Sequence, residues 1–94
     1  MSLVRIRIPM PLRTYTNGAD EVVVEASTVR DALAALTARH EGVQPRVLAP
    51  DGELRQFVNV FLGSRNVRTL QGLATTLDGD DVLSIIPAVA GGSA

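Results

Sequence analysis

A single stretch of this chain has helical spacing, and this limits the folds that the chain can adopt. Four apolar residues recur there at intervals of three and four positions: Val29, Ala32, Leu33 and Leu36. This spacing predicts one amphipathic helix near Thr28 to His40. Thr28 and Asp31 resemble a capping box in which aspartate replaces the usual glutamate, and Gly42 is the expected stop.

The other apolar runs alternate with polar residues, which is the period of a half-buried strand. The expected strands are Leu3 to Ile8, Val22 to Ala26, Phe57 to Leu62, a short edge strand at Asn66 to Thr69, and Val82 to Ile86. This order of elements predicts an α+β fold of the β-grasp (ubiquitin-like) class, a mixed sheet packed on one main helix. The chain has room for one domain, expected over residues 1–87, with a flexible C-terminal tail at 88–94.

Charge and composition argue against several classes of function. The net charge of −1 does not suit a nucleic-acid-binding protein, which needs basic residues to neutralise phosphates. No apolar stretch approaches the roughly 20 residues of a membrane span, and arginines interrupt the N-terminal segment where a signal peptide would be apolar. We therefore expect a cytoplasmic protein without nucleic-acid or membrane partners. All nine basic residues are arginine, so no lysine can link one copy to another, although a high-GC codon bias is the simpler explanation.

The residue types that most often carry catalysis give a weak case for an enzyme. His40 is the only histidine and follows the predicted helix, where a capping or solvated role is expected. Asp78, Asp80 and Asp81 could suggest a hard-cation site, but their position in one short turn favours a solvated loop. The chain has no cysteine. We expect no catalytic side chain, no metal site and no bound cofactor.

The C-terminal segment is the strongest functional signal. After Pro87 every side chain is small, and the six residues from Pro87 to Gly92 could extend about 20 Å. Because glycine has no Cβ, a Gly-Gly pair can pass through a narrow channel and approach a ligand closely. The segment that we expect to thread into partner active sites is Val89, Ala90, Gly91 and Gly92.

The end of the chain resembles the closing signature of a known family. Residues 78–82 read Asp-Gly-Asp-Asp-Val, and residues 85–92 read Ile-Ile-Pro-Ala-Val-Ala-Gly-Gly. Together they resemble the MoaD/ThiS family of ubiquitin-like sulfur carrier proteins, and the resemblance extends over nearly the whole chain. Residues 54–62 and 72–75 are most similar to the family's carrier that serves cysteine biosynthesis, whereas the small subunit of molybdopterin synthase is a more distant match.

The resemblance implies a chemistry that partner enzymes perform on the chain's terminal carboxylate. A ubiquitin-activating-type adenylyltransferase would use ATP to adenylate Gly92, and a sulfur donor would convert the acyl-adenylate to a thiocarboxylate. A sulfur-accepting synthase would then take the sulfide. In the cysteine pathway this would be a pyridoxal-phosphate cysteine synthase that holds an aminoacrylate. The carrier would supply a tethered nucleophile at high effective concentration.

Ser93 and Ala94 depart from the family pattern, because they follow the glycine that is to be activated. Some carriers of the family have such extensions, which a JAMM-type zinc protease removes. The resemblance therefore implies a precursor that is cleaved between Gly92 and Ser93. The alternative is that Ser93 and Ala94 were added in cloning.

Four other functions are compatible with the same residues. The chain could serve as the small subunit of molybdopterin synthase, with the large subunit as partner, or as a thiamine-type sulfur carrier. It could be a ubiquitin-like protein modifier that is joined through Gly92 to lysines of other proteins. It could also be a binding module whose tail has no role. A neighbouring gene for a cysteine synthase or for a large molybdopterin synthase subunit would separate the pathways.

The third predicted strand gives a candidate partner surface. If Val58, Val60 and Leu62 face the core, alternation places their neighbours on the outer face. These neighbours are Phe57, Asn59 and Phe61. Exposed aromatic residues are typical of protein interfaces. The alternative is that segment 41–56 covers the two phenylalanines.

Overall fold

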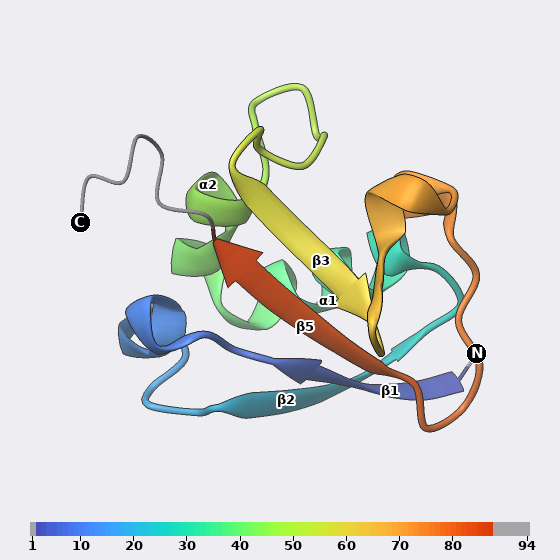
Figure 1. Cartoon of the computed structure of the whole chain (residues 1–94). Helices are drawn as coiled ribbons and strands as arrows, with labels where there is room; N and C mark the ends of the chain where they lie inside the picture. The colour runs from blue at the N-terminus through green and yellow to red at the C-terminus, as the bar shows by residue number, and fades with distance from the viewer. Residues whose placement is uncertain (1, 88–94) are drawn as a thin grey trace.

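The computed structural model describes residues 2–87 of the 94-residue chain. Its strands are β1 (Ser2–Arg7), β2 (Glu21–Ala26), β3 (Val58–Leu62), β4 (Arg65–Asn66) and β5 (Val82–Pro87). Its helices are α1 (Val29–Arg39) and a short α2 (Gln44–Val47), and Figure 1 shows α1 behind the sheet. Four short 3-10 helices are η1 (Met10–Tyr15), η2 (Glu41–Val43), η3 (Val67–Thr69) and η4 (Gly72–Ala74). The predicted flexible tail at 88–94 lies outside the described residues.

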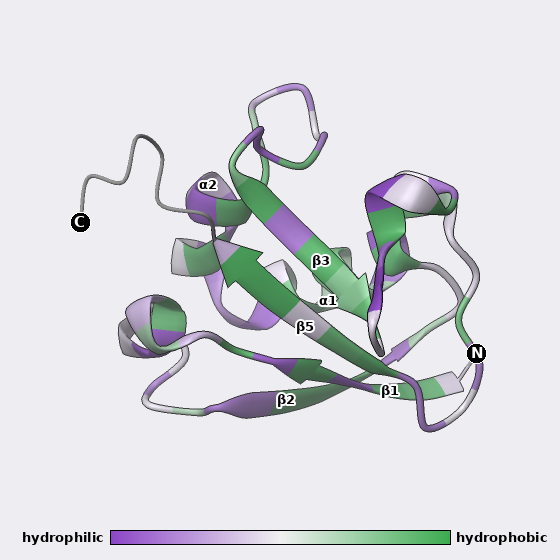
Figure 2. Ribbon diagram, in the orientation of Figure 1, coloured by the Kyte–Doolittle hydropathy of each residue, from purple (hydrophilic) through white to green (hydrophobic). Residues whose placement is uncertain are grey.

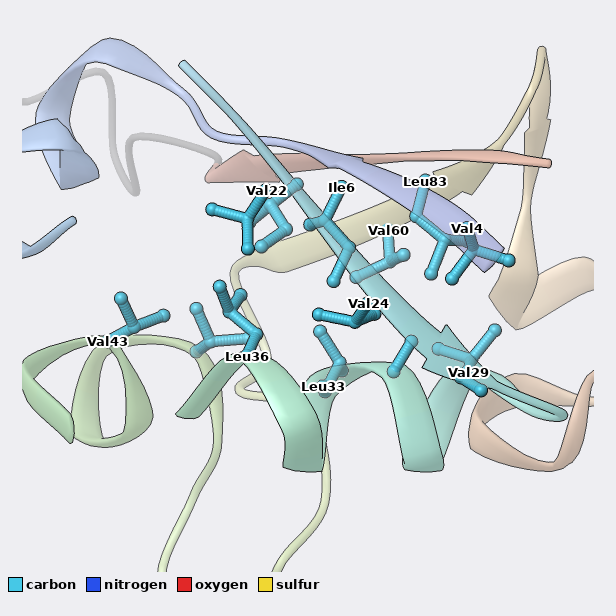
Figure 3. Packing of buried hydrophobic residues seen from close by; sticks show 14 of the residues in the cluster. Val4, Ile6, Val22, Val24, Val29, Leu33, Leu36, Val43, Val60 and Leu83 are labelled. Carbon is cyan, nitrogen blue, oxygen red and sulfur yellow. The ribbon is translucent and has the colours of Figure 1, made fainter. Parts of the chain in front are cut away.

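The five strands form one mixed sheet in the order β2-β1-β5-β3-β4. β1 and β2 form an antiparallel hairpin in which Val4 lies opposite Val24. β5 lies between β1 and β3, parallel to β1 and antiparallel to β3. With α1 packed against one face of this sheet (Figure 3), the predicted β-grasp fold is confirmed.

The core lies between the sheet and α1. The predicted helical stripe is buried along its whole length, since Val29, Ala32, Leu33 and Leu36 are each no more than 1% exposed. These side chains belong to one cluster with the inward-facing residues of the strands (Figure 3), among them Val4, Ile6, Val24, Val60 and Leu83. Apolar and polar residues alternate along β1 from Val4 (Figure 2), whereas Asn59 is the only polar residue of β3, so the face of the sheet turned away from α1 carries both polar and apolar side chains.

The structure agrees with the sequence prediction at the start of α1 but not at its end. Thr28 is the N-cap, and its hydroxyl accepts a hydrogen bond from the Asp31 N–H (3.2 Å), which is one of the two hydrogen bonds of the predicted capping box. The helix ends at Arg39, with His40 as C-cap. The prediction that Gly42 stops the helix is wrong. Gly42 lies in η2 and does not adopt the left-handed conformation of a helix-ending glycine.

Local hydrogen bonds shorten two of the predicted strands. Alternation predicts a strand from Phe57, but Phe57 lies in a turn that is closed by the Val58 N–H and the Arg55 carbonyl (3.0 Å), and β3 begins at Val58. The predicted strand at 66–69 is strand only at its first residue. The Asn66 side-chain oxygen accepts the Arg68 N–H (2.9 Å) and starts η3.

Candidate functional site

The described part of the chain ends on a central strand of the sheet. β5, which leads into the tail, is the third of the five strands in spatial order. Its last residue, Pro87, lies opposite Val58, the first residue of β3. Proline has no N–H for the strand ladder, which suits the end of a strand. The predicted tail residues 89–92 and the predicted cleavage site at Gly92 and Ser93 lie outside the described residues, so the described part of the site is the surface around Pro87.

Two exposed apolar side chains lie next to the end of β5, from which the C-terminal segment continues. Phe57 directly precedes Val58 and is 49% exposed, and Ile86 directly precedes Pro87 and is 45% exposed. Segment 41–56 therefore leaves Phe57 uncovered. Ile86 lies opposite Asn59 in the register of β3 and β5, so residues of the two strands meet on the outer face directly beside the end of β5.

Asn59 and Phe61 lie on the same outer face but are half-buried. Phe61 pairs across the sheet with Ser84 on one side and Asn66 on the other. The Asn59 side-chain oxygen accepts a hydrogen bond from the Asn66 amide (3.3 Å). The outer-face positions predicted for Asn59 and Phe61 are thus present, and Phe57 is exposed in the turn before β3, while the role of all three residues in partner binding stays a prediction. We call Phe57, Asn59, Phe61 and Ile86 the exit surface.

The outward position of Ile86 could have been predicted from the sequence, but it was not. Leu83 and Ile85 face the core, being 0% and 2% exposed. Alternation along the last strand therefore places Ser84 and Ile86 on the outer face, by the same rule that was applied to the third strand. Ile86 joins the exit surface for this reason.

Arg68 is the second residue that the sequence did not indicate. It lies in η3, and its side chain reaches back to the start of β3. Its Nη2 group donates to the Arg55 carbonyl and to the Val58 carbonyl, both at 2.7 Å, and its Nε–H donates to the Asn59 side-chain oxygen at 3.2 Å. No spacing rule connects residues that lie 9 to 13 positions apart, so no sequence pattern could have shown this cluster.

The other candidate residues take structural positions. The Asp81 carboxylate accepts the Asp78 N–H (2.7 Å), and the Asp80 N–H donates to the Leu3 carbonyl (3.0 Å), so this turn leads the chain into β5 beside β1. Within residues 2–87, no group of three or more histidines, cysteines and carboxylates is placed to hold a metal ion, and no pocket is found. None of the helices described there is long and apolar enough to cross a membrane.

Residues 6–92 match the model of the ThiS family, a match that covers most of the chain and extends to the second glycine of the Gly-Gly pair. The chain belongs to the ThiS family. Its β-grasp fold agrees with this assignment, and the predicted resemblance to the ubiquitin-like sulfur carriers is confirmed.

Individual relatives include both carriers and modifiers. The sulfur carrier protein CysO of Mycobacterium tuberculosis (strain ATCC 25618 / H37Rv) is 36% identical over 91 residues, which are 95% of this chain and 98% of CysO. Small archaeal modifier protein 3 of Haloferax volcanii is 43% identical over 70 residues, which are 74% of this chain and 75% of that protein. A chain in the crystal structure of the Amycolatopsis orientalis BexX/CysO complex matches with a TM-score of 0.87 and 37% identity, over 95% of this chain and 99% of that chain.

Proposed function

We propose that this protein is a sulfur carrier whose Gly92 carboxylate is activated and then converted to a thiocarboxylate. One observation carries the proposal. The family match runs to Gly92, and the strand that leads toward it ends at Pro87 beside the exit surface, where Phe57 and Ile86 are exposed. The five residues 88–92 reach about 17 Å when extended. This length would let Gly92 enter an active site while the exit surface contacts the protein around its entrance.

The proposed activation is chemistry that a partner performs on the carrier. An adenylyltransferase of ubiquitin-activating type would bind ATP, join the Gly92 carboxylate to the AMP moiety and release pyrophosphate. A sulfur donor would then displace AMP and leave sulfur in place of one carboxylate oxygen. Glycine suits this step because no Cβ crowds the attacked carbonyl. In this scheme the carrier itself binds no cofactor.

The relatives suggest where the sulfur goes. CysO is similar to this chain over 98% of its own length, which favours a sulfur amino acid, cysteine first, as the product. The acceptor would be a pyridoxal-phosphate cysteine synthase. Addition of the thiocarboxylate sulfur to its aminoacrylate would form the new carbon–sulfur bond.

Activation requires that the carboxylate of Gly92 is free. Any residues that follow it, here Ser93 and Ala94, would first have to be removed. A JAMM-type zinc protease that cuts between Gly92 and Ser93 would supply the mature end.

Protein modification is the second candidate function. Small archaeal modifier protein 3 is 43% identical to this chain over 70 residues, which favours conjugation of Gly92 to lysines of other proteins. Both functions begin with the same adenylation. They differ in the product that accumulates in cells, which is a thiocarboxylate for a carrier and an isopeptide conjugate for a modifier.

The first experiment compares two purified chains, one ending at Gly92 and one ending at Ala94, with ATP and the ubiquitin-activating-type enzyme of the same genome. Intact mass spectrometry should show an acyl-adenylate for the first chain alone. When a sulfide source is added, one oxygen of the Gly92 carboxylate in that chain should be replaced by sulfur. Efficient adenylation of the chain ending at Ala94 would contradict the need for trimming. If the trimmed chain from sulfur-replete cells were found only in conjugates, protein modification would be the better proposal.

A further inference from the structure

The Arg68 side chain holds the backbone on both sides of Phe57. Residues 55–58 form a turn in which the Val58 N–H donates to the Arg55 carbonyl (3.0 Å). The Arg68 Nη2 group donates to that same carbonyl and to the carbonyl of Val58, each at 2.7 Å. Phe57 thus lies between two residues whose carbonyls bind one guanidinium.

The position of Arg68 follows from the shortness of β4. β4 pairs only with Phe61 and Leu62, so the first residues of β3 have no strand beside them on that side within residues 2–87. Asn66 caps η3 by accepting the Arg68 N–H (2.9 Å), which directs the Arg68 side chain along this open edge. Hydrogen bonds from a charged donor are stronger than those between neutral groups, and the planar guanidinium can bind several acceptors at once.

The other end of the same turn is also anchored. The Arg55 N–H donates to the Val47 carbonyl (3.0 Å), and the Arg55 Nε–H donates to the Pro45 carbonyl, so Arg55 is fixed to α2. Phe57 is therefore held from α2 on one side and from η3 on the other, although its ring is 49% exposed. An exposed aromatic ring on a backbone tied down this firmly is suited to binding, because less conformational freedom is lost when a partner covers it.

The geometry points to Arg68 as a positioning residue for partner binding. It fixes Phe57 beside the exit of the tail, and the Phe57 ring then enters an apolar pocket next to the active-site entrance of the enzyme that activates Gly92. Arg68 acts through Phe57 and is not itself covered by the partner. This inference rests on the proposed function for its partner, while the role of Arg68 in holding the turn rests on the structure alone.

Hydrogen exchange tests the role of Arg68 in holding the turn without any partner. The Val58 amide bonds to a carbonyl that also binds Arg68, so R68A should speed Val58 exchange by about tenfold, since opening of the turn then breaks fewer bonds. The matched control is R65A, which removes the same charge from β4 next to η3. It should leave Val58 exchange unchanged. Equal exchange of Val58 in R68A and the wild type would overturn the inference.

Steady-state adenylation of chains ending at Gly92 tests the link to the partner. R68A should raise KM for the carrier by about three- to tenfold with kcat unchanged, because only binding is weakened. F57A should raise KM at least as much. The double variant F57A/R68A should have the KM of F57A alone, because Arg68 has nothing to position once the ring is gone. Multiplied effects in the double variant would mean that Arg68 contacts the enzyme itself, and would overturn the inference.

R68K covers the case in which R68A fails to fold, as judged by circular dichroism. Its ammonium keeps the charge and can donate to the same carbonyls, so KM should recover only as far as Val58 protection recovers. A normal KM with fast Val58 exchange would show that charge is what matters, against the inference. If the wild type ending at Gly92 is not adenylated at all, the proposed function fails, and the partner half of this inference fails with it. The exchange result then still decides whether Arg68 holds the turn.

Discussion

At the scale of one residue, the glycine at position 42 is explained by a contact with a residue distant in the sequence. Rules that read only neighbouring positions do not include such contacts. A Cβ at position 42 would lie 2.8 Å from Cδ1 of the Tyr15 ring and 3.4 Å from the Tyr15 Cβ. The ring is itself covered by the Arg46 guanidinium, 3.8 Å from the ring centroid. The Arg46 Nη1 group also donates to the Gly42 carbonyl (3.0 Å). Glycine at this position lets η1 pack closely against η2.

The first stability prediction follows from this packing. Gly42→Ala should lower the free energy of unfolding by about 1–3 kcal/mol, the usual cost of an added methyl group in a packed site. The Tyr15 ring must shift to relieve the overlap, and a shift of the ring relative to Arg46 should weaken the cation–π contact as well. Thermal or urea denaturation measures the loss of stability.

The matched control is Gly79→Ala. Gly79 has no heavy atom within 4 Å of an added Cβ and no positive φ, so this change should alter the stability by less than about 0.5 kcal/mol. If the two variants were equally stable, the packing of Tyr15 on Gly42 would not be the reason for the glycine.

At the scale of elements, α1 is the part of the fold whose stability depends most on the burial of one apolar face. Leu33 lies in the middle of its apolar stripe and is 1% exposed. Leu33→Ala should cost about 2–5 kcal/mol, because the lost contacts are replaced by a cavity. Leu3→Ala is the comparison, since Leu3 is 58% exposed and should cost less than about 0.5 kcal/mol. A loss at Leu33 as small as that at Leu3 would show that α1 packs in a different rotational phase.

The elements that were predicted from sequence are those whose own residues determine them. The stripe of α1 and the alternation of β1 and β5 are read from neighbouring positions, and the structure confirms them. Among the short elements, α2 was missed and β4 was misplaced. α2 is held in part by Arg55, whose N–H bonds to the Val47 carbonyl, and β4 ends where the Asn66 side chain starts a 3-10 turn. Contacts between distant residues and side-chain caps leave no periodic signal.

The same distinction applies to the candidate site. The outward positions of Asn59 and Phe61 follow from alternation, and so does that of Ile86. Phe57 is exposed for a different reason, because it lies in the turn that Arg68 and Arg55 hold. The sequence therefore predicted correctly that Phe57 is exposed, but it did not give the reason. It contained no pattern that indicated Arg68.

At the scale of the whole molecule, folding and the proposed chemistry use different parts of the chain. All the buried apolar side chains among the described residues lie between Val4 and Ile85. The residue proposed to react, Gly92, follows the last of them by seven positions. Changes at residues 91 and 92 should therefore leave the stability of the domain unaltered, and any loss of function that they cause can be assigned to the chemistry.

The last prediction uses this separation to distinguish a carrier from a binding module whose tail has no role. In a chain ending at Gly92, Gly92→Ala should slow adenylation on the order of 100-fold, because a Cβ beside the reacting carbonyl displaces it from the attacking geometry. Deletion of Gly91 and Gly92 should abolish adenylation, while both variants keep the melting temperature of the parent chain. Pyrophosphate exchange and calorimetry on the same samples give the two measurements. A deletion that restores cysteine synthesis as well as the parent chain, in cells that lack the gene, would leave the tail without a role and would favour the binding module.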